Sequence, residues 1–226
     1  MSSKRVFVYG ASGHGKVVAD ILISKNDAEF VGFVDDREDL KGSEVMGFPV
    51  IGNGEWLRQE AAHSQVSVAL GTGESQCRHL LARRCRQWQI EVLTAVHPAA
   101  TVSRTARLGA GTVVMAGAVI NPDARVGMGA IVNTGAVLEH DVEVGDYAHV
   151  APNAVMGGAS QLGNFSHLGL GAAVLQGIWI GSHTIIGAGA VVVRDLPDAV
   201  VAIGIPARIH RRLQPEGFSN PAVLGK

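Results

Sequence analysis

The chain has 226 residues and a formal net charge of −1, which suits one large domain or two small ones with a buried core. It contains 29 glycines, while only 5% of its residues are aromatic and 17% are charged; glycine is roughly twice as frequent as usual. The apolar content excludes disorder, the unperiodic glycines exclude collagen, and the near-zero charge gives no reason to expect nucleic acid or an anionic membrane as a partner. A regular, closely stacked fold is left.

The N-terminal segment resembles neither a signal peptide nor a membrane anchor. Its apolar run, Val6–Tyr9, ends at Gly10 and is too short for either. Cys77 and Cys85 lack the C-x-x-C spacing of a zinc or redox pair, so we expect them to pack within a helix. We therefore expect a cytoplasmic protein without a membrane-inserted segment.

Residues 4–95 alternate between strand and helix patterns. Strands are expected at Arg5–Tyr9, Phe30–Val34, Val66–Leu70 and Ile90–Ala95, and helices at Lys16–Ser24, Glu55–Ala62 and Glu74–Gln87. Strands separated by helices predict a small parallel sheet covered on both faces. We therefore predict an α/β, Rossmann-like domain over residues 1–97.

The pattern changes after Pro98, because from Val102 to Val192 every sixth residue is aliphatic or methionine. The residue four positions later is usually small, as at Ala106 and Ala118. A hexapeptide period with one aliphatic and one small inward residue is typical of a parallel β-helix with three hexapeptides per triangular coil. We predict a left-handed parallel β-helix domain over residues 98–226, which includes a C-terminal tail, with many of the glycines in the turns of the β-helix.

A glycine-rich turn, Gly10-x-x-Gly13-x-Gly15, lies between the first expected strand and helix. The free N–H groups and the dipole at a helix N-terminus favour anions such as phosphates. Asp35, at the end of the second strand, could hold a ribose or a uracil. The spacing departs from G-x-G-x-x-G, so a nicotinamide cofactor is not favoured, and a purely structural turn stays open.

Several short motifs occur in a fixed order along the chain: Tyr9–Gly15, Asp35-Asp36, Gly71, Asn133-Thr134, Glu139-His140-Asp141, His149-Val150-Ala151 and Gly204–Arg208. In this order they resemble the hexapeptide-repeat acyltransferases, and most closely the members related to sialic-acid O-acetyltransferase and the UDP-4-amino-sugar N-acetyltransferases of bacillosamine synthesis. The resemblance implies acetyl-CoA as donor, a UDP-linked amino-deoxysugar as acceptor, no metal, and a homotrimer with each cofactor slot between neighbouring subunits.

The chemistry of acetyl transfer needs a base for the attacking group and a donor for the oxyanion. Residues 102–193 contain no cysteine and no lysine, which favours direct attack over an acyl-enzyme. We predict His140 as the general base, because an imidazole suits proton removal at neutral pH. Asp141 would orient it, although the related enzymes usually carry glutamate there. An exposed turn histidine without a role is the competing interpretation.

The remaining site residues follow from the resemblance. It implies that the N–H of Gly158 is the oxyanion donor, that His149, Leu170 and Ala188 contact acetyl-CoA, and that the sugar nucleotide meets Ser12, Gly13, His14, Asp35, Asp36 and Gly71. It also implies that Arg208, Arg211 and Arg212 lie near the adenosine 3′-phosphate of the cofactor.

Other polar residues receive a plainer interpretation. His149 and His167 are one coil apart and should stack, but we interpret His167 and His183 as surface residues. Arg78, Arg83, Arg84 and Arg86 are interpreted as a solvated helix face. A zinc site of the β-helical carbonic anhydrase kind is disfavoured by the spacing of the histidines.

Three alternatives to the predicted N-acetyltransferase stay open. The acceptor could be the hydroxyl of a sialic acid or the amine of a GDP-linked sugar. The chain could also be a non-catalytic scaffold that binds a sugar nucleotide.

Overall fold

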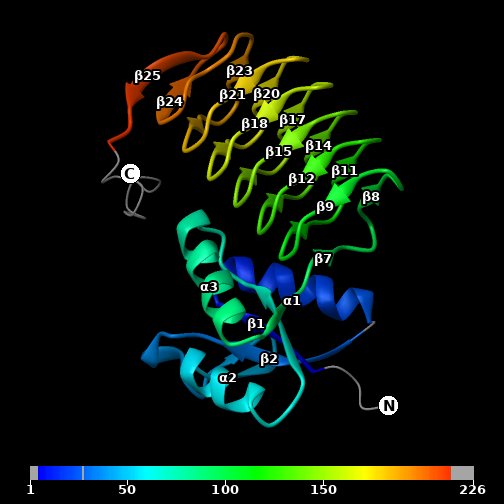
Figure 1. The fold of residues 1–226 in the computed structure, drawn as a ribbon, viewed down its shortest axis with the longest axis vertical. Coiled ribbons are helices and arrows are strands. Elements are labelled where there is room, and N and C mark those ends of the chain that lie inside the picture. Colours follow the sequence, from blue (N-terminus) through cyan, green and yellow to red (C-terminus); the bar gives the residue numbers. More distant parts are fainter. Residues whose placement is uncertain (1–4, 27, 215–226) are drawn as a thin grey trace.

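The computed structural model describes residues 5–26 and 28–214 and shows an α/β domain joined to a long β-helix (Figure 1). The predicted C-terminal tail beyond residue 214 lies outside the described residues. In the first domain a six-stranded sheet has the order β3-β4-β2-β1-β5-β6. Its elements are β1 (Arg5–Tyr9), α1 (Gly13–Lys25), β2 (Glu29–Val34), the 3₁₀ turn Glu38–Leu40, β3 (Glu44–Val45), β4 (Phe48–Gly52), α2 (Gly54–Ala61), β5 (Val66–Leu70), α3 (Ser75–Gln87) and β6 (Glu91–Val92).

The sheet is covered on both faces, as predicted, because alternate residues of each strand point to opposite sides. Val6 and Val8 pack with α1, whereas Phe7 and Tyr9 pack with α2 and α3. All strand pairs are parallel except β3 with β4. The sequence pattern did not indicate this antiparallel hairpin. Phe48–Gly52 contains a proline and a glycine, which are as typical of turns as of an edge strand.

The β-helix consists of two-residue strands in three walls. The first wall is an eight-stranded sheet of β7 (Ala95–Val96), β10 (Val113–Val114), β13 (Ile131–Val132), β16 (His149–Val150), β19 (His167–Leu168), β22 (Ile185–Ile186), β24 (Val200–Ile203) and β25 (Arg208–Arg212). The second wall contains β8 (Thr101–Val102), β11 (Val119–Ile120), β14 (Val137–Leu138), β17 (Val155–Met156), β20 (Ala173–Val174) and β23 (Val191–Val192). The third wall contains β9 (Arg107–Leu108), β12 (Arg125–Val126), β15 (Glu143–Val144), β18 (Gln161–Leu162) and β21 (Trp179–Ile180).

The hexapeptide prediction is confirmed, since each of the predicted inward positions from Val102 to Val192 is the second residue of a strand. Strands of successive coils pair in parallel with a shift of eighteen residues, as in Val114 with Val132. The inward aliphatic and small residues form one buried core along the helix. Stacking in register lets each coil bury its apolar edge against the next one.

The transition between the two folds differs from the prediction. The last strand expected at Ile90–Ala95 is divided: β6 belongs to the α/β sheet, but β7 pairs with β10 and starts the first wall. The hexapeptide series therefore begins one repeat earlier, at Val96. Helix α1 fills the junction, because its apolar residues share one buried cluster with Val113 and Ile131 of the first wall.

The turns of the β-helix depend less on glycine than expected. From Gly111 to Gly189 one residue in each turn has a left-handed conformation, and it is glycine in some turns but Asp141 (φ 60°), Asn153 (φ 57°) or Phe165 (φ 57°) in others. Aspartate and asparagine tolerate this region because their short side chains hydrogen-bond locally.

Candidate active site

His140 and Asp141 form a pair at the corner between the second and third walls, just after β14. The His140 Nδ1 lies 2.8 Å from the Asp141 Oδ2, and the two side chains are 64% and 61% exposed. The hydrogen bond that the imidazole donates to the Asp141 carboxylate raises the pKa of His140, and burial opposes this rise. With Nδ1 held by the carboxylate, Nε2 faces away from the pair and is the nitrogen able to take a proton from a bound group.

Gly158 lies against the ring of His140, one coil further along the same corner. A Cβ built on Gly158 would be 2.6 Å from the His140 Nε2, so only glycine leaves the imidazole in place. The backbone also links the two positions, because the Ala159 N–H donates to the His140 carbonyl at 2.9 Å. Within the described chain, the Gly158 N–H has no hydrogen-bond acceptor. The structure thus brings His140, Asp141 and Gly158 together.

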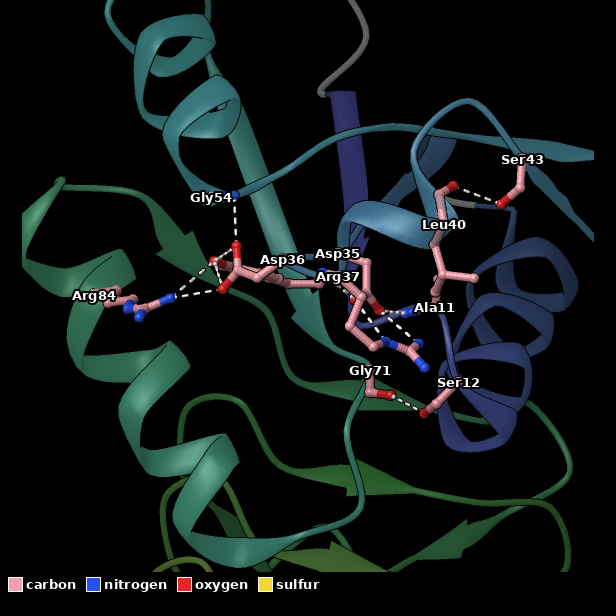
Figure 2. Close-up of polar contacts among 11 residues, drawn as sticks. Ala11, Ser12, Asp35, Asp36, Arg37, Leu40, Ser43, Gly54, Gly71 and Arg84 are labelled. Atoms are coloured by element: carbon pink, nitrogen blue, oxygen red, sulfur yellow. Dashed lines mark hydrogen bonds and ion pairs between the residues drawn. The ribbon is translucent and has the colours of Figure 1, made fainter.

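The glycine-rich turn joins β1 to α1 by close backbone packing. A Cβ on Gly15 would be 2.0 Å from the Gly10 carbonyl oxygen, and one on Gly71 would be 2.3 Å from the same atom. Gly13 has open space where its side chain would be, and Ser12 donates to the Gly71 carbonyl at 3.2 Å (Figure 2). Gly10, Gly15 and Gly71 therefore shape the turn, whereas Ser12 and Gly13 present an open helix N-terminus.

Asp35 lies beside this turn and forms an ion pair with Arg37, a residue that was not among the predicted site residues. Its carboxylate accepts the Ala11 N–H at 2.7 Å and the Nε and Nη2 of Arg37 at 3.0 Å each (Figure 2). Burial alone would raise the pKa of Asp35, but the hydrogen bonds from Arg37 and Ala11 hold it below its usual value. The sequence does carry a sign of this ion pair, because Arg37 directly follows the two aspartates.

Asp36 is engaged in holding helices to the sheet. Its carboxylate accepts hydrogen bonds from the Tyr9 hydroxyl at 3.0 Å, the Gly54 N–H at 2.8 Å and the Arg84 Nη1 at 2.7 Å. These contacts link β1, α2 and α3 (Figure 2). The two adjacent aspartates therefore point to different sets of partners, and Asp35 is the one beside the glycine-rich turn.

His149 and His167 stack one coil apart on the first wall, as predicted. Their residues are register partners, and their ring centroids are 4.8 Å apart at an interplanar angle of 80°. Burial lowers the pKa of His149 well below its usual value, and His167 and His14 add to this effect. The Asn133 Nδ2 lies 3.0 Å from the His149 Nε2. The structure thus places His14 of α1 close to His149 of the β-helix.

The interpretation of His167 and His183 as surface residues was wrong. The ring of His167 packs edge-on against His149, and that of His183 lies parallel to Phe165 with centroids 5.1 Å apart. Burial lowers the pKa of both histidines. The hexapeptide pattern gives the repeat position of a residue but does not show what covers its outer face.

Of the arginines of α3 predicted to form a solvated face (Arg78, Arg83, Arg84 and Arg86), Arg78 contradicts the prediction. Arg78 is 0% exposed and bonds to backbone carbonyls of both domains. Arg84 binds Asp36, and the Arg86 Nη2 lies 3.2 Å from the Met128 Sδ. Arg83, Arg84 and Arg86 are nevertheless exposed, as expected, and no contact of the Arg83 side chain occurs among the described residues. Cys77 and Cys85 do pack in this helix, and burial raises the pKa of Cys85 to about 12.

Two of the three residues expected to contact acetyl-CoA, Leu170 and Ala188, lie at the corner between the first and second walls. Leu170 is 58% exposed, and Ala188 is exposed one coil above it. The hairpin of β24 and β25 continues this apolar column with Ile205, which is 77% exposed. Arg208 and Arg211 follow on β25. The sequence analysis overlooked Ile205, although it lies inside one of the motifs quoted above.

A shallow cavity of about 590 Å³ lies elsewhere, along the outer face of the third wall. None of the predicted site residues lines it. Within residues 5–26 and 28–214 no cluster of three or more histidine, cysteine or acidic side chains is arranged to hold a metal ion. In the same part of the chain, no helix has the length and apolar character needed to cross a membrane.

Comparison with known proteins places these features in a family. Residues 5–85 match the family described as PglD N-terminal domain. The chain is 37% identical over 121 residues to UDP-N-acetylbacillosamine N-acetyltransferase of Bacillus subtilis (strain 168), in an alignment that covers 50% of this chain and 52% of that one. The chain thus spans about half the length of the curated relative that it matches.

Solved structures extend the similarity to almost the whole chain. PerB from Caulobacter crescentus, in complex with CoA and GDP-perosamine, is 40% identical, with a TM-score of 0.86 and coverage of 91% of this chain and 97% of that one. The acetyltransferase domain of PglB from Neisseria gonorrhoeae FA1090, in complex with acetyl coenzyme A, is 35% identical, with a TM-score of 0.87 and coverage of 92% and 100%. The chain therefore belongs to the hexapeptide-repeat sugar-nucleotide N-acetyltransferases related to these proteins.

Proposed function

We propose that this protein transfers the acetyl group of acetyl-CoA to the 4-amino group of a UDP-linked amino-deoxysugar. The observation that carries the proposal is the His140–Asp141 pair placed directly against Gly158. The α/β domain, residues 1–97, would bind the sugar nucleotide and the β-helix, residues 98–226, the acetyl donor. A GDP-linked amino sugar is the second candidate, because the similarity to PerB, crystallised with GDP-perosamine, covers almost the whole chain.

The proposed reaction is a direct attack of the sugar amine on the thioester carbonyl. His140 takes the proton that the amine loses as the new C–N bond forms, and Asp141 holds the imidazole through Nδ1. The Gly158 N–H, which has no acceptor within the described chain, would donate to the oxyanion of the tetrahedral intermediate. The C–S bond then breaks, and the CoA thiolate receives the proton that His140 carries.

The substrate contacts are proposed on the same basis. Ser12 and Gly13 at the open N-terminus of α1 suit a diphosphate, since free N–H groups favour anions there. His14 directly follows Gly13 in α1, and the ion pair of Asp35 and Arg37 lies beside the turn. Gly71 supports this arrangement through the Ser12 contact. Asp36 would act through its hold on Gly54 and Arg84.

The acetyl donor would lie along the corner between the first and second walls. Leu170 and Ala188 offer exposed apolar surface there, and His149 is on the adjoining wall. The arginines Arg208, Arg211 and Arg212 on β25 suit the 3′-phosphate of the adenosine. Acetyl-CoA as donor and the free cysteines Cys77 and Cys85 fit a cytoplasmic enzyme.

We further propose a homotrimer, because one chain keeps the two halves of the site apart. His140 lies at the corner between the second and third walls, whereas Leu170 lies at the corner between the first and second. The three walls also differ in their outer faces. The first wall is partly covered by α1, and the third carries polar residues such as Arg125 and Gln161.

The second wall is the apolar face that would surround a three-fold axis. From β11 onward its outward residues are aliphatic: Val119, Val137, Val155, Ala173 and Val191. If the second walls of three subunits face one axis, the His140 corner of each subunit meets the Leu170 corner of its neighbour. Each neighbouring pair of subunits then completes one site.

Turnover tests the proposed reaction directly. Release of free CoA thiol should be seen with acetyl-CoA and a UDP-linked 4-amino sugar, tested beside the GDP-linked sugar and sialic acid. His140→Ala should lower kcat by about 10²- to 10⁴-fold, as expected for the loss of a general base. No turnover with any amino-sugar nucleotide would overturn the proposal, and near-wild-type kcat in His140→Ala would overturn the base.

The pH dependence of kcat/KM tests the role of Asp141. Because Asp141 raises the pKa of His140, the unprotonated base forms only at higher pH, and the acidic limb of the profile lies above the usual histidine value. Asp141→Asn removes the carboxylate and should move this limb to lower pH, with a plateau reduced about tenfold. Asparagine tolerates the left-handed backbone at this position. Asp141→Glu, which keeps the charge, is the control, and an unmoved limb in Asp141→Asn would refute the pairing.

Substitution of Gly158 tests whether the imidazole must remain where it is. In Gly158→Ala the new Cβ forces the ring of His140 aside, and kcat should fall by about 10²-fold. In the His140→Ala background the same substitution should cause little further loss, because the two residues act together. Equal losses from Gly158→Ala in both backgrounds would show that the two residues act independently.

Subunit assembly is tested on the second wall. Val155 is 39% exposed in the single chain, and Val155→Lys should convert the trimer to monomers because it places charge in an apolar interface. Activity should be lost with assembly. Gln161→Lys, on the third wall, is the matched control and should stay trimeric. Sedimentation equilibrium measures both, and a trimeric Val155→Lys protein would contradict the proposed axis.

A further inference from the structure

Arg78 connects the two domains through a buried guanidinium group. It lies on α3 and is the largest fully buried side chain among the described residues. Its Nη1 donates to the carbonyls of Leu70 and Thr72 at 3.0 and 2.8 Å, at the end of β5. Its Nε and Nη2 donate to the carbonyls of Gly129 and Gly111, at 2.8 and 2.9 Å, in two successive coils of the β-helix. The planar fork therefore fixes the end of the sheet against the β-helix.

The charge of Arg78 has no carboxylate partner among the described residues. Burial lowers the pKa of Arg78 to about 9, so the guanidinium is still charged at neutral pH. Carbonyl dipoles compensate it only in part, and a buried charge is costly to retain. Packing alone does not require a cation at this position. A neighbouring group that responds to the charge would explain why the cation is kept.

That group is His14, at the start of α1. The Arg78 Nη1 lies 3.5 Å from the His14 Nε2. A guanidinium nitrogen can only donate, so the contact favours an unprotonated Nε2 and leaves the proton of His14 on Nδ1. Burial lowers the pKa of His14 to about 3, and the charge of Arg78 contributes to this shift.

His149 is affected by the same charge from the opposite domain. After burial, the groups that lower its pKa are His167, His14 and Arg78, while a hydrogen bond from the imidazole to the backbone of Gly73 opposes them. His14 and His149 thus remain neutral on the two sides of the junction. Neutral imidazoles both donate and accept hydrogen bonds, as recognition of sugar hydroxyl or amino groups requires.

We propose that Arg78 is a positioning residue for the acceptor sugar: its fork sets the α/β domain on the first coils, and its Nη1 holds the imidazole of His14 beside the glycine-rich turn. The identity of the substrate rests on the proposed function, whereas the contacts of Arg78 do not depend on it. Arg78 is buried and does not touch the substrate. Its effect passes through His14, which lies beside the open turn at Ser12 and Gly13.

Two substitutions separate the fork from the charge. Arg78→Lys keeps a cation but cannot make the four carbonyl contacts, and it should raise the KM for the sugar nucleotide about tenfold without changing its pH dependence. Arg78→Met removes both and should raise this KM further, with a new ionisation in kcat/KM below neutral pH as His14 becomes easier to protonate. The KM for acetyl-CoA should stay within about twofold, because the donor lies on the β-helix. A general loss of stability would instead lower the active fraction and leave both KM values unchanged.

Arg83→Met is the matched control, since Arg83 is exposed on the same helix. It should leave both KM values and the pH profile unchanged. A folded Arg78→Met protein with wild-type KM and pH profile would overturn the proposal.

A measurement on the unmodified protein covers the case in which Arg78→Met does not fold. The full chain, with ¹³C-labelled histidine, is titrated by NMR, and His14→Gln assigns the His14 signal among the nine histidines. His14 should not titrate above pH 5 in the wild-type protein or in Arg78→Lys, and titration near pH 6.5 in the wild type would refute the proposal. If no nucleotide sugar is turned over, the proposed function fails, but this titration still decides whether His14 is neutral beside Arg78, as the proposal requires.

Discussion

The in-register stacking of the β-helix coils is the constraint on which the rest of the structure depends. Between β7 and β23, successive strands of each wall pair with a shift of eighteen residues, held at the spacing of adjacent strands by the parallel ladder. This rule puts Gly158 against His140 and His167 over His149. It also stacks the rings of Tyr147, Phe165 and His183 at one corner.

The same period provides the anchor for the α/β domain. The β-helix carbonyls that bind Arg78 belong to Gly111 and Gly129, which occupy equivalent positions in successive coils. A fork with two N–H groups on one edge matches two such carbonyls because their separation is that of the ladder. The repeat thus offers carbonyl acceptors at a regular spacing, and Arg78 of α3 binds two of them.

Much of the fold and part of the site could be predicted because they depend on local pattern. The hexapeptide series predicted the strands from β8 to β23, and the stack of His149 on His167 followed from their separation. His140 and Asp141 were found together because adjacent residues need no fold to meet. Arg78 was misjudged for the opposite reason, since its burial depends on the β-helix packing against α3. In a helix without a clear apolar face, an arginine on the buried side has the same local pattern as one in solvent.

The positions of the site residues explain why a single coil cannot complete the proposed chemistry. A two-residue strand on each wall separates the corner of His140 from the corner of Leu170, and a rigid ladder does not bend to bring them together. The stiffness that holds His140 against Gly158 therefore prevents the base from reaching a donor bound on its own chain. In the proposed trimer, association through the apolar second wall would resolve this conflict, because rotation about a three-fold axis brings unlike corners of different chains together. On this view the aliphatic outer face from Val119 to Val191 is as necessary for catalysis as His140.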